Sequence, residues 1–236
     1  MRRAAAMLAA AVICGAVVLT AGTAQVQAQA QTQTQAQEPE WMQRHRHVTR
    51  LIAQSEAQGG AMVPELRDFM LAFQKDILSV TPLEAMDYAG QFLEPKDPAD
   101  MASYLEMIST IATLAWYDAL RFTDESGRVE LMHNHALFKR AFLLAGDEMT
   151  QRMLTFLQTQ PEAAAAAVDA GIGHAAAVRD RVVYDQRWPS AFGLGPLTCT
   201  LAPADCPPAP ELPPEEWEAA FAHAAVTVTY YYRNND

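Results

Sequence analysis

The stretch ADMASYLEMISTIATLAWYDALRF, residues 99–122, decides the fold that this sequence predicts. Apolar side chains recur along it with the helical period of about 3.6 residues, so they line one face of an amphipathic helix. This face consists of Met101, Leu105, Ile108, Ile111, Ala115, Ala119 and Phe122, widened by Tyr104, Ala112 and Trp116. Asp97 can cap the helix and Pro98 can open it. We therefore expect this helix at the centre of the core.

Three helical patterns precede this stretch. A short helix begins near Trp41 and ends at Gly59-Gly60, and a second spans Met62–Val80. Thr81–Glu84 reads as a capping box with proline at the first helical position, so it starts a third helix that runs to about Leu93.

Further helical patterns follow a turn at Asp124–Gly127. They cover residues 129–145, 147–159, 161–170 and 174–184, and Gly146, Pro161 and Gly171-Ile172-Gly173 separate them. Pro214 opens a last helix. Its run VTVTYYY, Val226–Tyr232, has strand-like composition, so helix and extended chain remain alternatives there.

These patterns predict an all-α fold. We expect a single domain over residues 41–236, built from about eight or nine helices. Residues 196–214 are rich in proline and lack a helical period, which predicts a long loop before the last helix. In an oxidising compartment the two cysteines of this loop, Cys199 and Cys206, are expected to form a disulfide that staples it.

The N-terminus has the pattern of an export signal. Arg2 and Arg3 precede an apolar run over Ala4–Leu19 that is too short for a membrane helix. We expect a signal peptide over residues 1–24, with cleavage as late as residue 30 as an alternative, and a disordered Gln/Ala-rich tether over residues 25–40. Cys14 lies inside the apolar run, which disfavours a lipoprotein anchor. The predicted location is therefore periplasmic or secreted.

The charge of the chain narrows the class of partner. The net charge is −11, and removal of Arg2 and Arg3 with the signal makes it more negative. Nucleic acid needs a basic footprint, so it is excluded as a partner. The mature chain has no predicted membrane span. The expected partner is thus an unknown protein or small molecule, and no cofactor is predicted.

Two sets of side chains point to chemistry as alternatives. Glu130 and His133 share a helical face, and His135 lies nearby, which would suit a cell-envelope hydrolase or a metal-dependent enzyme. Asn134 as a helix cap, with both histidines in solvent, is the competing interpretation. The carboxylate pairs Glu65/Asp68 and Glu84/Asp87 would suit glycoside hydrolysis, but acidic residues in first turns are also favoured by the helix dipole.

The segment DRVVYDQRWPSAFGLG, Asp180–Gly195, is the predicted ligand site. Its candidate binding residues are Arg181, Tyr184, Asp185, Arg187, Trp188 and Phe192. Arg181 and Asp185 are spaced to pair on one helix face, while the aromatic rings could line a pocket beside the Arg187 cation. The alternative is that these rings pack beneath the proline-rich loop. The sequence thus favours a binding or interaction module over an enzyme.

This segment resembles the C-terminal signature of a family of uncharacterised bacterial helical proteins, whose pattern is D-R-V, a short gap, then P-Q-x-Y-G-T-Q. Residues 180–182 match, as do Pro189, Phe192 and Gly193. Ser190 and Gly195 replace the two glutamines, and Leu194 replaces the threonine. The resemblance implies a helical fold and leaves the activity open.

Overall fold

We analysed a computed structural model of the chain, which describes residues 40–59, 62–122, 124–132, 136–194 and 210–233. The chain divides into two compact units, Met1–Gln43 and Arg44–Asp236. Of the first unit, only residues 40–43 are described, as the beginning of the first helix. The predicted signal peptide and nearly all of the predicted tether therefore lie outside the described residues.

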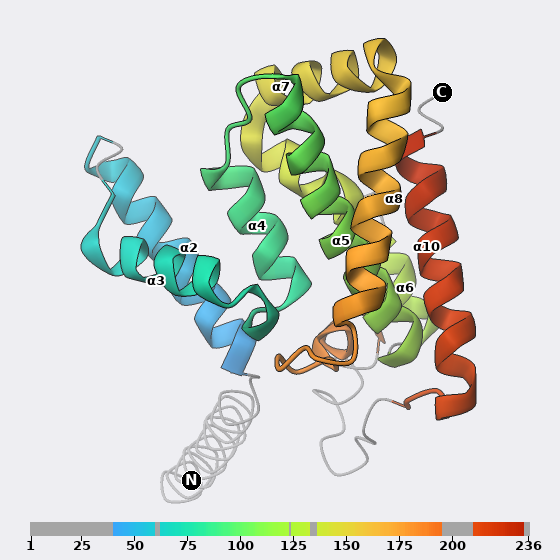
Figure 1. The fold of residues 1–236 in the computed structure, drawn as a ribbon. Helices are drawn as coiled ribbons and strands as arrows, with labels where there is room; N and C mark the ends of the chain where they lie inside the picture. The colour runs from blue at the N-terminus through green and yellow to red at the C-terminus, as the bar shows by residue number, and fades with distance from the viewer. Residues whose placement is uncertain (1–39, 60–61, 123, 133–135, 195–209, 234–236) are drawn as a thin grey trace, which may run out of the picture. The chain divides into compact units, whose positions relative to one another are not determined.

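The second unit is all-α where it is described, which confirms the predicted fold class (Figure 1). The helices of the described chain are α2 (Glu40–Ala57), α3 (Pro64–Lys75), α4 (Pro82–Phe92), α5 (Pro98–Phe122), α6 (Glu125–Met132), α7 (Ala136–Thr159), α8 (Pro161–Val178) and α10 (Trp217–Arg233). Short 3₁₀ helices lie at η1 (Ile77–Ser79), η3 (Trp188–Ala191) and η5 (Pro214–Glu216). Among these helices, none combines the length and apolar character that crossing a bilayer requires.

Helix α5 is the centre of the core. It packs against α4, α7, α8 and α10, and α8 and α10 run side by side along it (Figure 1). Its apolar stripe is buried, and Leu105, Ile108 and Ala115 are fully inaccessible. Asp97 caps the helix as predicted, because its Oδ1 accepts the N–H groups of Ala99 and Asp100, each at 2.9 Å.

The capping box predicted at the start of α4 is present. The Glu84 N–H donates to Thr81 Oγ1 at 3.4 Å, and the Thr81 N–H donates to Glu84 Oε2 at 2.8 Å. This pair fixes where α4 begins and therefore where Val80 and Pro82 lie beside α5.

Of three predicted helix boundaries, two differ from the structure and one is confirmed. The helix predicted over Met62–Val80 ends at Lys75, where Asp76 leaves the helical region with φ −148°. The chain bends at Gly146, as predicted, with φ +87° inside α7. The predicted break at Gly171–Gly173 is wrong, because α8 continues through both glycines to Val178.

The last helix resolves the alternative left open for Val226–Tyr232. Helix α10 continues to Arg233, and Val228 and Tyr232 are buried. The Tyr232 hydroxyl donates to the Phe138 carbonyl at 3.1 Å, so packing against α7 overrides the strand-like composition.

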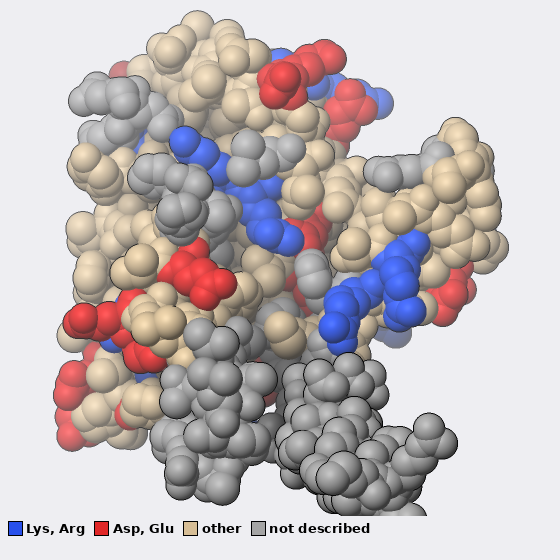
Figure 2. Space-filling view, turned by 180° about the vertical axis from the view of Figure 1, so that it is seen from behind, with Lys and Arg blue, Asp and Glu red and all other residues tan. Residues whose placement is uncertain are grey.

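Acidic and basic side chains are interspersed over the face of the molecule that Figure 2 shows.

Candidate functional site

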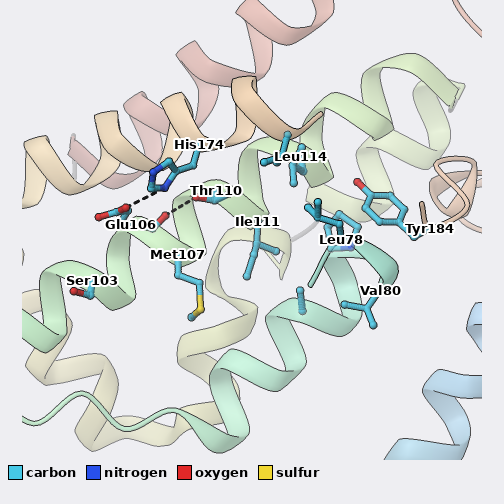
Figure 3. A pocket seen from close by; sticks show the side chains of 13 residues that line it. Leu78, Val80, Ser103, Glu106, Met107, Thr110, Ile111, Leu114, His174 and Tyr184 are labelled. Carbon is cyan, nitrogen blue, oxygen red and sulfur yellow. Dashed lines mark hydrogen bonds and ion pairs between the residues drawn. The ribbon is translucent and has the colours of Figure 1, made fainter. Parts of the chain in front are cut away.

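A pocket of about 410 Å³ lies along α5 in the described part of the chain. Helix α5 lines it with Ser103, Glu106, Met107, Thr110, Ile111 and Leu114. Leu78 and Val80 approach from the η1 segment, Pro82 and Ala85 from α4, and His174 and Val178 from α8. Tyr184 and Ser103 lie toward opposite ends of the lining (Figure 3). The volume is typical of small-molecule sites.

The pocket is apolar along most of its length. On α5, the side chains that line it include the apolar residues Met107, Ile111 and Leu114 (Figure 3). The residues from η1 and α4 are aliphatic as well. Such a surface gains free energy when it buries apolar parts of a ligand.

The most polar feature of the lining is a pair between α5 and α8. Glu106 Oε1 lies 3.0 Å from His174 Nδ1, and the two side chains face each other in Figure 3. The Glu106 side chain is 34% exposed and that of His174 is 65% exposed. Ligand groups and water can therefore reach both side chains.

Gly171 explains how this pair forms. A Cβ at this position would lie 2.4 Å from the Glu106 carbonyl oxygen and 2.8 Å from Ser109 Cβ. Only a residue without a side chain allows α8 to approach α5 so closely. His174 lies three residues further along α8 and on the same face, so the close approach brings it to Glu106.

The hydroxyl groups of the lining have already donated their hydrogens. Thr110 Oγ1 donates to the Glu106 carbonyl at 2.9 Å, and Ser103 Oγ donates to the Ala99 carbonyl at 3.1 Å. Each oxygen keeps lone pairs, so these groups can only accept further hydrogen bonds without rearrangement.

A second polar cluster surrounds Asp118, nearer the C-terminal end of α5. This carboxyl is completely buried. Its Oδ2 accepts from the Tyr184 hydroxyl and from Trp188 Nε1, each at 2.9 Å, and Gln186 Nε2 lies 3.5 Å from Oδ1. Burial raises the pKa of Asp118 to about 7, although these hydrogen bonds and the nearby Arg121 act in the opposite direction. Burial and the Asp118 charge raise the pKa of Tyr184 well above its usual value.

Arg121 ties the chain before α10 to the same end of α5. Its guanidinium lies 3.8 Å from the centre of the Trp217 ring and donates to Glu211 at 2.9 Å. Its carbonyl accepts the Leu212 N–H at 3.1 Å. These contacts are structural, since they hold the polypeptide that leads into α10.

The residues of the predicted ligand segment fall into a buried group and an exposed group. Tyr184 and Trp188 are buried on Asp118, and Phe192 is half-buried with its ring edge-on to Trp188. In contrast, Arg181, Asp185 and Arg187 are exposed. Within this set Tyr184 alone lines the pocket. A ligand role for the other residues stays a prediction.

The predicted pairing of Arg181 with Asp185 on a helix face is wrong, because α8 ends at Val178. Asp185 Oδ1 instead accepts the Arg187 N–H at 3.0 Å. The Val183 N–H donates to the Leu78 carbonyl at 3.0 Å. One local bond and one bond to the distant η1 segment thus replace the helical bonds that the sequence pattern predicted.

The alternative metal site cannot be assembled from the described residues. Among them, no group of three potential ligands gathers, and His133 and His135 lie outside the described residues. Glu130 accepts the N–H of Gly193. The predicted disulfide partners Cys199 and Cys206 also lie outside the described residues.

The carboxylate pairs considered for hydrolysis are engaged in ion pairs. Both oxygens of Glu84 accept from Arg44, at 2.6 and 2.8 Å. Asp87 pairs with Arg140, and Glu65 lies 3.1 Å from His47 Nε2. Glu84 and Asp87 therefore connect helices, and this engagement weakens the case for a catalytic carboxylate pair.

Sequence reasoning missed Glu106 and Asp118. Asp118 continues the apolar stripe of α5, so a lone acidic residue on a buried helix face was the available signal. Glu106 had no such signal, because its partner His174 comes from α8 and is distant in sequence. The comparisons with known proteins add no further candidate: no family model, curated protein or solved structure matches this chain.

Proposed function

We propose that this protein is a binding module that holds a small, mostly apolar molecule in the pocket along α5. The observation that carries the proposal is the pocket itself: an apolar lining of about 410 Å³ with a reachable Glu106–His174 pair. Apolar surface of this kind supplies affinity, and a few polar groups supply orientation.

Binding is favoured over catalysis by the hydrogen bonds of the lining. A nucleophilic hydroxyl would need to donate to a base such as His174. Ser103 and Thr110 donate to backbone carbonyls, and Tyr184 donates to Asp118. An envelope hydrolase or metal-dependent enzyme using Glu130, His133 and His135 is the alternative, and a stoichiometric transition metal in purified protein would support it.

We also propose that binding takes place in the periplasm or outside the cell. The support is the N-terminal pattern of Arg2, Arg3 and the apolar run after them. A disulfide between Cys199 and Cys206 belongs to the same proposal. The intact mass of the exported protein under non-reducing conditions tests both: a retained N-terminus or two free thiols would contradict it.

The binding proposal is tested with N-phenyl-1-naphthylamine, an apolar fluorescent probe. Wild-type protein should bind it saturably, with a rise in fluorescence. Met107 is half-buried in the pocket lining, and Met107→Trp replaces its side chain with a bulkier indole ring. This substitution should weaken probe binding by about tenfold or more.

The matched control is Met132→Trp, which changes another half-buried methionine that does not line the pocket. This variant should bind the probe like wild type. Thermal unfolding followed by circular dichroism verifies that both variants are folded. Equal affinity of Met107→Trp and wild type would refute the assignment of the pocket.

A further inference from the structure

We infer that the ligand of this pocket is a cationic amphiphile, an apolar molecule with a primary ammonium group that Glu106 binds. The inference rests on the proposed function, and it adds the chemistry of the ligand's polar group. Three observations support it: the hydrogen-bond capacity of the lining, its charge, and the arrangement of its polar atoms along α5.

The free hydrogen-bond capacity of the lining is mainly that of an acceptor. The hydroxyls of Ser103, Thr110 and Tyr184 each donate elsewhere and keep oxygen lone pairs. Glu106 has two carboxylate oxygens, and the contact to His174 involves Oε1. Its Oε2 remains available in this contact. A ligand group that donates hydrogen bonds suits this set better than one that accepts them.

The charge of the lining favours a cation. Glu106 is the acidic residue of the lining, which includes no lysine or arginine. A carboxylate or phosphate would face Glu106, with His174 as its only potential counter-charge. An ammonium would instead gain a charge-assisted hydrogen bond from Glu106. The net charge of −11 for the whole chain acts in the same direction.

The acceptors also have a suitable arrangement. Ser103 lies three residues before Glu106 and Thr110 four residues after it, so all three share one face of α5. An ammonium has three donor hydrogens and no acceptor. Met107, Ile111 and Leu114 extend the lining from this polar end toward Tyr184, along the path that an alkyl chain would occupy (Figure 3).

Isothermal titration calorimetry with octylamine, octanol and octanoate tests the inference, because these probes share an alkyl chain and differ in the head group. Wild-type protein should bind octylamine most tightly and octanoate most weakly. Glu106→Gln removes the charge at nearly constant size. It should weaken octylamine binding by about tenfold and leave octanol binding within about twofold.

The outcomes separate this inference from the proposed function. If octanol and octanoate bind and octylamine does not, the pocket binds ligands but the ammonium inference fails. Tighter binding of octanoate that is lost in His174→Gln would overturn it and assign the head group to His174. If none of the three binds wild type, and Met107→Trp also leaves the naphthylamine probe unaffected, the proposed function itself fails.

Discussion

The carboxylates of the two polar clusters on α5 differ in their burial and in their partners. Asp118 is completely buried and meets Tyr184, Trp188 and Gln186, all from the segment after α8. Glu106 is one-third exposed, meets His174, and faces a pocket. The first cluster is filled by the chain itself, whereas the second keeps unused acceptors. On the proposed function, this difference makes the first cluster an anchor and the second the recognition site.

Tyr184 belongs to both regions. Its ring lines the pocket, and its hydroxyl donates to Asp118 at 2.9 Å. The anchor therefore holds one end of the pocket in place without presenting a charge to it. Changes at Asp118 should affect stability, and changes at Glu106 should affect the choice of ligand.

The largest expected effect is the dependence of the free energy of unfolding on pH, which comes from Asp118. Its pKa is about 7 in the folded protein and 3.8 in its ordinary state. Between these values the folded protein keeps a proton that the unfolded chain loses, so a rise in pH favours unfolding. This contribution to stability is fully present below about pH 4 and is lost by about pH 7, a change of roughly 4 kcal/mol.

Asp118→Asn is the matched variant for this prediction. The amide oxygen can accept from both Tyr184 and Trp188, as Oδ2 does, but the side chain does not titrate. Urea unfolding at pH 4, 6 and 8 should show a free energy of unfolding that falls more steeply in wild type than in the variant. Parallel profiles would contradict the account. At pH 8 the variant should bind octylamine like wild type.

A smaller effect is expected at the two glycines of α8. Gly171→Ala forces a methyl group against the Glu106 carbonyl and Ser109, and should lower the free energy of unfolding by about 2 kcal/mol. It should also weaken octylamine binding, since α8 carries His174 and Val178. Gly173→Ala is the control, because its Cβ would meet open space, and alanine should stabilise the helix by about 0.5 kcal/mol. Equal effects of the two substitutions in chemical denaturation would show that Gly171 does not set the helix spacing.

The sequence predicts the fold well where local signals dominate. The stripe on α5, the Asp97 cap and the Thr81–Glu84 box all depend on residues close in the chain, and the structure confirms them. The continuation of α8 through Gly171 was missed because its reason is tertiary. Glycine usually weakens a helix, but here it allows close contact with α5.

The site could be predicted only in part for the same reason. Tyr184 and Trp188 were singled out as candidate ligand-binding residues, and in the structure both donate to Asp118, which lies on another element. Glu106 and His174 meet only because α5 and α8 pack closely. Without knowledge of which helices touch, neither residue has a local pattern that marks it.

The most direct test of the central claim is an NMR titration of protein labelled with ¹³C at the methionine methyl groups. Met107 lines the pocket, whereas Met153 is buried on α7 and does not. On addition of octylamine, we predict that the Met107 methyl signal shifts and saturates while the Met153 signal stays in place. A Met107 signal that does not move at saturating octylamine, or a Met153 signal that moves equally, would contradict the assignment of the binding site to the pocket along α5.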